Sequence, residues 1–134
     1  MSLIVDASVA VPWLIREDGS DRARSILARG HTLIAPEMLL AEAGNAFFKR
    51  VIRNAMSAEH AVEALRAVRI PFSDFVSTSV LIETAARISY EFRHPVYDCL
   101  YVALALRTDC GRLATLDRRM MDVAARAGVV CHNL

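Results

Sequence analysis

The sequence predicts an α/β protein with three layers, in which a short, mostly parallel central sheet is flanked by helices. Two observations support this prediction. Short runs rich in Ile, Leu and Val alternate along the chain with longer segments of helical periodicity. Strands that alternate with helices form parallel sheets covered on both faces. The chain of 134 residues contains no repeat and no linker, so we expect a single domain over residues 1–134.

The first half of the chain is expected to hold two strands and four helices. Leu3 to Val5 is a short apolar run typical of a buried strand, and Pro12 is tolerated within the first turns of the helix that follows. Gly30 is a stop signal for the second helix. The expected elements are a strand at 2–5, a helix at 8–16, a helix at 20–29, a strand at 31–36, a helix at 37–53 and a helix at 57–69.

The second half continues the alternation. It holds a weak strand candidate, "IPF", and a segment with apolar residues on nearly every helical face, "YDCLYVALAL". The expected elements are a strand at 70–72, a helix at 76–92, a helix at 97–107, a strand within "GRLAT", a helix at 117–127 and a last strand at 129–131. In parallel sheets, ligands bind beyond the carboxyl ends of the strands.

The composition limits the class of protein. It is 54% hydrophobic with a mean hydropathy of +0.31, so we expect part of the surface to be covered by another chain. No apolar run approaches the roughly 18 residues of a membrane span, and the N-terminus does not resemble a signal peptide, so we expect a cytoplasmic protein. The three cysteines contain no CxxC pair and are expected to be buried and inert.

The charge of the chain gives little indication of its ligand. A net charge of +1 lacks the basic excess typical of a domain that coats nucleic acid. Lys49 is the only lysine among 16 basic residues, and arginine suits phosphate, although a genome rich in arginine codons would explain the same bias.

Three aspartates follow strands or open helices. Asp6 ends the first strand, Asp117 follows the "RLAT" strand, and Asp98 lies at the start of the apolar helix. Each has an ordinary structural explanation, because Asp at a helix N-terminus contributes about 1 kcal/mol as a cap or through the helix dipole. Alone, none of them indicates a site.

Glu42 is a carboxylate that capping does not explain. It lies in the middle of a helix, where Met38, Leu39 and Ala46 place it beside a largely apolar stripe. A buried glutamate requires a partner, and Lys49 could provide one in a simple surface pair. Alternatively, Glu42 and the three aspartates surround a divalent cation. Two carboxylates about 4 Å apart repel by roughly 4 kcal/mol at a dielectric of 20. Oxygen ligands favour Mg²⁺ or Mn²⁺.

Four segments in order resemble the motif blocks of PIN-domain ribonucleases, specifically the VapC-type toxins of bacterial toxin–antitoxin pairs: "LIVDASV", "APEMLLAEAGNAF", "YDCLYVALAL" and "LATLDRRM". The resemblance covers essentially the whole chain. It implies a PIN-like fold and a catalytic, metal-binding set formed by Asp6, Glu42, Asp98 and Asp117. It also implies that Ser8 and Thr115 hydrogen-bond this set, and that Asn45 lies one helical turn beyond the glutamate.

The implied activity is metal-dependent hydrolysis of RNA phosphodiester bonds by an endoribonuclease that uses Mg²⁺ or Mn²⁺. The resemblance also implies a cognate antitoxin and a toxin homodimer. Arg118 and Arg119 fall in the first turn of a helix, where the dipole disfavours cations, so they are candidate contacts to phosphate; two solvated arginines are the alternative. Asp122 is expected to face solvent, and His94 and His132 to be ordinary capping or surface histidines.

Two other functions compete with this one. A non-catalytic PIN-like module that binds RNA or protein would keep the fold without cutting. A phospho-acceptor signalling domain also has aspartates at the ends of parallel strands, but it needs a lysine after a late strand. Here Lys49, the only lysine, lies in an early helix, which disfavours that class.

Overall fold

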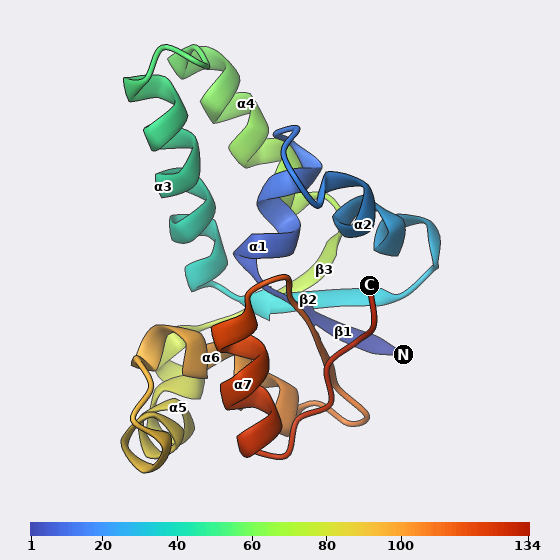
Figure 1. Ribbon diagram of the computed structural model, residues 1–134, viewed down its shortest axis with the longest axis vertical. Coiled ribbons are helices and arrows are strands. Elements are labelled where there is room, and N and C mark those ends of the chain that lie inside the picture. Colours follow the sequence, from blue (N-terminus) through green and yellow to red (C-terminus); the bar gives the residue numbers. More distant parts are fainter.

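A parallel sheet of four strands forms the centre of the computed structural model, which describes residues 1–134. The strands lie in the order β3-β2-β1-β4, and every pair of neighbours is parallel. Their bounds are β1 Ser2–Val5, β2 Thr32–Pro36, β3 Phe72–Val76 and β4 Arg112–Ala114. Helices cover both faces of this sheet (Figure 1), so the expected three-layer α/β class is confirmed.

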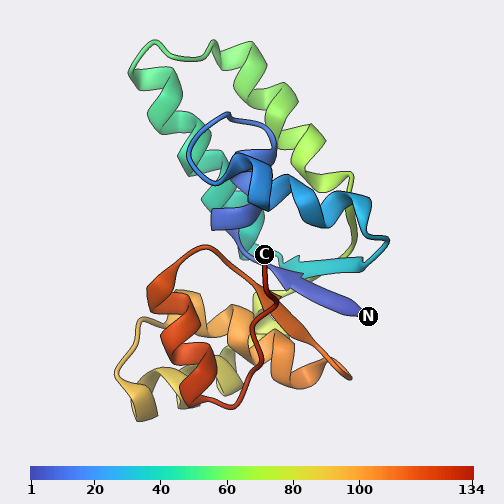
Figure 2. The same cartoon turned by 45° about the vertical axis from the view of Figure 1, so that its right-hand side comes forward.

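The helices divide into two groups, one on each side of the sheet (Figure 2). The first four lie on one side, where α3 and α4 pack together and project away from the strands, and the last three lie on the other side. The helices are α1 Ala7–Ala10, α2 Ser20–Ser25, α3 Met38–Ile52, α4 Ala58–Arg69, α5 Thr78–Phe92, α6 Val96–Arg107 and α7 Arg118–Arg126. Two short 3₁₀ turns, Val11–Trp13 and Ile26–Ala28, continue α1 and α2.

The core is densest around β1 and α6. Leu3, Ile4 and Val5 have no exposed surface, because β1 is a central strand with a helical layer on each side. Helix α6 is buried continuously from Cys99 to Ala105 and packs against β1 and β2. This burial on every face explains why its sequence is apolar all round. The carboxyl end of β1 is therefore rigidly supported.

The order of the strands marks one place as a ligand site. From β1 the chain builds β2 and β3 on one side, and it later returns to add β4 on the other side. A parallel sheet leaves a crevice beyond the strand ends where the order reverses in this way. Val5 of β1 pairs with Ala114 of β4, so Asp6 and Thr115 emerge side by side at this point.

Four elements differ most from the sequence prediction. The helix expected at 20–29 leaves α geometry after Ser25 and continues as a 3₁₀ turn to Ala28. The first helix leaves α geometry at Ala10, since Pro12 has no N–H to continue the α-helical pattern, and a 3₁₀ turn follows. The third strand runs over Phe72–Val76 instead of 70–72; it is an edge strand and partly exposed, which weakens its apolar signal. Residues 129–131 do not form a strand but contribute one bridge, between Leu113 and Cys131.

The cysteines and the membrane prediction can also be compared with the structure. Cys99 is buried and Cys131 is partly buried, but the prediction is wrong for Cys110, which is exposed. Cys110 lies in the turn between α6 and β4 with φ at +54°, where its side chain cannot reach the core.

No helix combines the length and the apolar character that crossing a bilayer requires.

A histidine pair joins the C-terminal tail to the start of β2. The rings of His31 and His132 meet edge to face, with centroids 5.3 Å apart, and the Nε2 atom of each is buried without a hydrogen-bond partner. His132 is therefore not the ordinary surface residue expected from the sequence. Burial and the positive charges of His31, Arg29 and Arg112 lower the pKa of His132 below its usual 6.5.

This pair predicts a loss of stability in acid. Because the pKa of His132 is lower in the folded chain, the unfolded chain binds more protons as pH falls through about 6.5. The contribution of His132 to the free energy of unfolding therefore falls in that range. We expect the Tm of His132→Gln, relative to that of the unchanged protein, to rise between pH 7.5 and 5, measured without divalent ions, because Asp6 affects both proteins alike. The same change of Tm with pH in the two proteins would contradict this explanation.

Candidate active site

Asp6 is held at the end of β1 by two hydroxyl groups. Ser8 Oγ donates to its Oδ1 and Thr115 Oγ1 donates to its Oδ2, each at 2.6 Å. The residue is only 3% exposed. Although Asp6 occupies the N-cap position of α1, its side chain makes no capping hydrogen bond. Capping therefore does not account for this carboxylate.

The two hydroxyl groups are oriented by the backbone. Ser8 Oγ accepts a hydrogen bond from the Leu116 N–H at 2.8 Å, and Thr115 Oγ1 accepts one from the Asp117 N–H at 3.0 Å. Because these N–H groups occupy acceptor positions, each hydroxyl hydrogen is left to point at Asp6. The segment after β4 is thus tied to the corner between β1 and α1, and Asp6 accepts on both of its oxygens.

Glu42 reaches the same region from α3. Its side chain is half-buried, and Tyr101 Oη donates to its Oε1 at 2.5 Å. Tyr101 lies on α6 and is buried, so this bond connects helices from opposite sides of the sheet. Lys49 is exposed and forms no ion pair, so the alternative Glu42–Lys49 surface pair does not exist.

Sequence reasoning missed Tyr101 as a partner of the glutamate. A signal was present, since a tyrosine in a fully buried helix needs a hydrogen-bond acceptor for its hydroxyl group. Nothing local identified that acceptor, because Glu42 and Tyr101 are 59 residues apart.

Asp98 lies in the first turn of α6 and binds a histidine. His94 Nε2 lies 2.6 Å from Asp98 Oδ2, and the His94 side chain is 10% exposed. Since a carboxylate can only accept, the imidazole donates here. The interpretation of His94 as an ordinary capping or surface residue is therefore wrong. The spacing of four residues was the available signal, although His94 precedes the first helical residue, Val96.

Asp117 is the one aspartate that caps its helix. It is the N-cap of α7, and its Oδ1 accepts a hydrogen bond from the Arg119 N–H at 2.9 Å. Its second oxygen makes no hydrogen bond within the protein. Asp117 therefore combines an ordinary structural role with a position next to Asp6 and Thr115.

The four carboxylates act on one another electrostatically. Burial raises the pKa of Asp6 to about 7; the hydrogen bonds from Ser8 and Thr115 oppose this rise, and the charges of Glu42 and Asp117 add to it. Burial also raises the pKa of Glu42, as does the charge of Asp98, while the hydrogen bond from Tyr101 lowers it. None of the four pairs with a lysine or an arginine. The four carboxylates are therefore electrostatically coupled, and no lysine or arginine balances their charge.

The donor set suits a hard divalent cation. No three acidic, histidine or cysteine side chains are grouped closely enough to hold an ion by themselves. Each carboxylate instead accepts a hydrogen bond from the protein. Mg²⁺ keeps several water ligands and commonly uses only one or two carboxylates, so a set of this kind is compatible with it. A set of ligand atoms that are all oxygen and carry unbalanced negative charge fits Mg²⁺ or Mn²⁺.

The remaining predicted residues are exposed on α3 and α7. Asn45 is exposed on α3, and its side chain makes no hydrogen bond, so the structure does not connect it to the carboxylates. Arg118 and Arg119 are exposed at the start of α7. Asp122 is exposed as expected, and it pairs with Arg126 at 3.7 Å.

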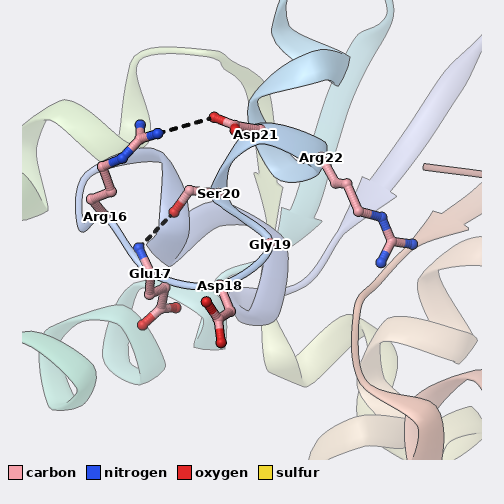
Figure 3. A pocket seen from close by; sticks show the side chains of 7 residues that line it. All are labelled: Arg16, Glu17, Asp18, Gly19, Ser20, Asp21 and Arg22. Carbon is pink, nitrogen blue, oxygen red and sulfur yellow. Dashed lines mark hydrogen bonds and ion pairs between the residues drawn. The ribbon is translucent and has the colours of Figure 1, made fainter.

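The largest surface hollow lies elsewhere, in the loop between α1 and α2. Residues 16–22 surround about 540 Å³, and none of the four carboxylates lines it (Figure 3). The Ser20 hydroxyl accepts from the Glu17 N–H, and Arg16 pairs with Asp21 at 3.6 Å. Gly19 has φ at +88° and lies against Leu116, so this loop packs on the segment that carries Asp117.

Comparisons with known proteins agree with the fold. The family model described as "PIN domain" matches residues 3–126. Ribonuclease VapC1 of Mycobacterium tuberculosis is 34% identical over 131 residues, covering 96% of this chain and 92% of that protein. Ribonuclease VapC3 of Pyrobaculum aerophilum is 27% identical over 124 residues, covering 91% and 94% of the two chains.

Two solved structures share the fold. The crystal structure of PAE2754 from Pyrobaculum aerophilum has a TM-score of 0.73 at 21% identity, covering 98% of this chain and 83% of that one. VapBC2 from Rickettsia felis, bound to a DNA fragment from its promoter, has a TM-score of 0.72 at 15% identity, covering 100% and 99%. The chain therefore belongs to the PIN-domain family and is similar over nearly its whole length to VapC ribonucleases.

Proposed function

We propose that this protein is a metal-dependent endoribonuclease, a toxin that hydrolyses RNA phosphodiester bonds. The observation that carries the proposal is a set of four electrostatically coupled carboxylates, with Asp6 at the strand-order reversal, that has no lysine or arginine to balance it. Such a set is costly to fold unless a cation binds to it. The names of the two similar ribonucleases support the choice of RNA as substrate.

In this proposal Asp6, Glu42, Asp98 and Asp117 are the metal ligands and form the catalytic set. A divalent ion bound there would stabilise negative charge on a phosphodiester undergoing hydrolysis. The chain's own contribution is positioning. Ser8 and Thr115 fix both oxygens of Asp6, so its rotamer is set before any ligand arrives.

Two further side chains position the other carboxylates. Tyr101 fixes one oxygen of Glu42, and His94 fixes one oxygen of Asp98. In each case the second oxygen remains free to face the pocket. Hydrogen bonds of this kind orient ligands and are a usual part of metal sites. We keep Asn45 as a proposed supporting residue of the metal site only because it lies one helical turn after Glu42.

We also propose a cognate antitoxin, a homodimer and action in the cytoplasm, with the whole chain forming one PIN domain. The similarity in fold to VapBC2 from Rickettsia felis supports a protein partner here. Large apolar side chains lie exposed on both helical layers, on α3 and α4 and on α5 and α6: Phe48, Ile52, Val62, Val80, Tyr90, Tyr97 and Leu106. Such surfaces are typical of protein interfaces. Light scattering of the purified protein tests the dimer.

The alternative functions have less support. A PIN-like module that binds without cutting has no need to keep four unbalanced carboxylates, and the similar proteins are named ribonucleases. A phospho-acceptor domain would place a lysine near its aspartates, but Lys49 is exposed on α3 without an ion pair.

Metal removal tests the proposed function. We expect purified protein to cleave structured RNA with Mg²⁺ or Mn²⁺, to stop when EDTA is added, and to recover when the ion is restored in excess. Cleavage products are followed on a denaturing gel. Cleavage that continues in EDTA would contradict the proposal, and so would an absence of cleavage with both ions in a protein that remains folded by circular dichroism.

A further inference from the structure

A second, basic hollow adjoins the acidic pocket. It encloses about 290 Å³ and is lined by His94, Arg118, Arg119 and Asp122, none of them apolar. It touches the acidic set at two points. His94 binds Asp98, and the Arg119 N–H binds Asp117. The hollow is therefore contiguous with the proposed catalytic carboxylates.

The charges that line this hollow are not balanced. Asp122 is its only acid, and it pairs with Arg126, one turn further along α7. The side chains of Arg118 and Arg119 form no ion pair and no hydrogen bond. Both lie in the first turn of α7, where the helix dipole disfavours positive charge. Two unpaired cations in an unfavourable position, facing one hollow, are suited to an anion.

We propose that this hollow is a subsite for a phosphate group of the RNA backbone, next to the phosphate that is cut. The inference rests on the proposed ribonuclease function. The acidic pocket repels RNA, so attraction must come from its borders. The planar guanidinium groups of Arg118 and Arg119 match phosphate oxygens in a forked geometry.

The lining of the hollow favours recognition of the RNA backbone over recognition of an RNA base. Its volume lies near the lower end of the roughly 300–1,000 Å³ of small-ligand sites, which suits a sugar–phosphate unit. It contains no aromatic or apolar side chain on which a base could stack, apart from the imidazole that is already bonded to Asp98. Phosphate contacts position a strand without reading its sequence. The subsite therefore sets the register of the strand on the catalytic carboxylates.

The test compares two double variants that remove the same charge. Arg118→Gln/Arg119→Gln removes the subsite. Arg66→Gln/Arg69→Gln is the control, because these two arginines are exposed on α4 and form no ion pair. We expect the first variant to raise KM for RNA about 10- to 100-fold with a smaller change in kcat, and to reduce the salt dependence of RNA binding by about one or two ions. The control should match the unchanged protein.

A chemically modified substrate locates the contact. RNA in which a phosphate beside the cleavage point is replaced by an uncharged methylphosphonate should lose affinity for the unchanged protein but not for Arg118→Gln/Arg119→Gln. Equal KM values and equal salt dependence in the two double variants would overturn the subsite, while cleavage by the unchanged protein would leave the ribonuclease function intact. The subsite would also be overturned if Arg118→Gln/Arg119→Gln lost binding of an acidic peptide but kept its binding of RNA. If neither the unchanged protein nor the variants cleave RNA, the proposed ribonuclease function fails. The salt dependence of RNA binding still tests the subsite in that case.

Discussion

Asp6→Asn is expected to abolish RNA cleavage and, without divalent ions at pH 8, to make the protein more stable. Cleavage should fall by about 10³-fold or more, because each 1.4 kcal/mol of lost transition-state stabilisation is a factor of ten. The stability gain follows from burial. Asp6 is 3% exposed, and its pKa rises from 3.8 to about 7 in the folded chain. The folded chain therefore binds a proton that the unfolded chain releases between about pH 4 and 7.

The sign and size of this effect follow from proton linkage. Because the folded state holds the extra proton, the free energy of unfolding falls as pH rises through that window, and the loss is complete above pH 7. A rise of about three pKa units corresponds to about 4 kcal/mol. The asparagine amide cannot accept from both Ser8 and Thr115, which costs about 1 kcal/mol. The net gain of about 3 kcal/mol at pH 8 is expected to raise Tm by about 10 °C.

Thermal unfolding in EDTA at pH 8 and at pH 4.5 measures this gain. At pH 4.5 Asp6 is protonated in the folded chain, so the advantage of the variant should disappear or reverse. Asp74→Asn is the matched control, because that carboxylate is exposed on β3 and forms no ion pair, so the variant should leave Tm and cleavage nearly unchanged. If Asp6→Asn were less stable than the unchanged protein by the same amount at both pH values, burial of the ionised Asp6 carboxylate would not destabilise the fold, and the explanation would be wrong.

Mg²⁺ or Mn²⁺ should stabilise the protein much more at pH 8 than at pH 5.5. A ligand at 100 times its Kd contributes about 2.7 kcal/mol, or about 10 °C in Tm for a chain of this size. The ion needs ionised carboxylates, and the pKa values of Asp6 and Glu42 are both raised. With a pKa of about 7, Asp6 is only about 3% ionised at pH 5.5, so the apparent affinity should be about 30-fold weaker.

Isothermal titration with Mn²⁺ in two buffers of different ionisation enthalpy counts the protons released. Near pH 7, where Asp6 is half ionised, we expect a release of about half a proton or more for each ion bound. Glu42→Gln should weaken binding, and Asp74→Asn should not. Binding of equal strength at both pH values, with no proton release, would place the ion away from the carboxylates.

Much of the fold can be predicted because its signals are local. The apolar run before Asp6 forms a fully buried strand, and the all-apolar segment after Asp98 forms the most buried helix. The sequence misplaces the third strand, since an edge strand lacks a buried face on which to show a pattern. The first helix is shorter than its sequence predicts, because one missing N–H, at Pro12, outweighs otherwise favourable helix formers.

The sequence proposes the acids of the candidate site but not their hydrogen-bond partners. In the sequence, capping explains Asp6 but not Glu42, and the structure adds that the Asp6 side chain does not cap its helix. The sequence offers Lys49, within one helix, as a partner of Glu42, but the contact that forms is with Tyr101, where α3 and α6 meet beyond the sheet. For His94 the only signal is its spacing of four residues from Asp98, and His94 precedes the first helical residue. Contacts between distant segments depend on the fold, and a single sequence does not encode them locally.

Crystals soaked in Mn²⁺ test the central claim most directly, because the anomalous signal of manganese locates the ion without reference to activity. We predict one or two peaks bounded by Asp6, Glu42, Asp98 and Asp117, with at least one carboxylate oxygen within about 2.3 Å of a peak and water completing the coordination. An anomalous map with no peak in this pocket at saturating Mn²⁺, at a pH above 7.5, would contradict the account.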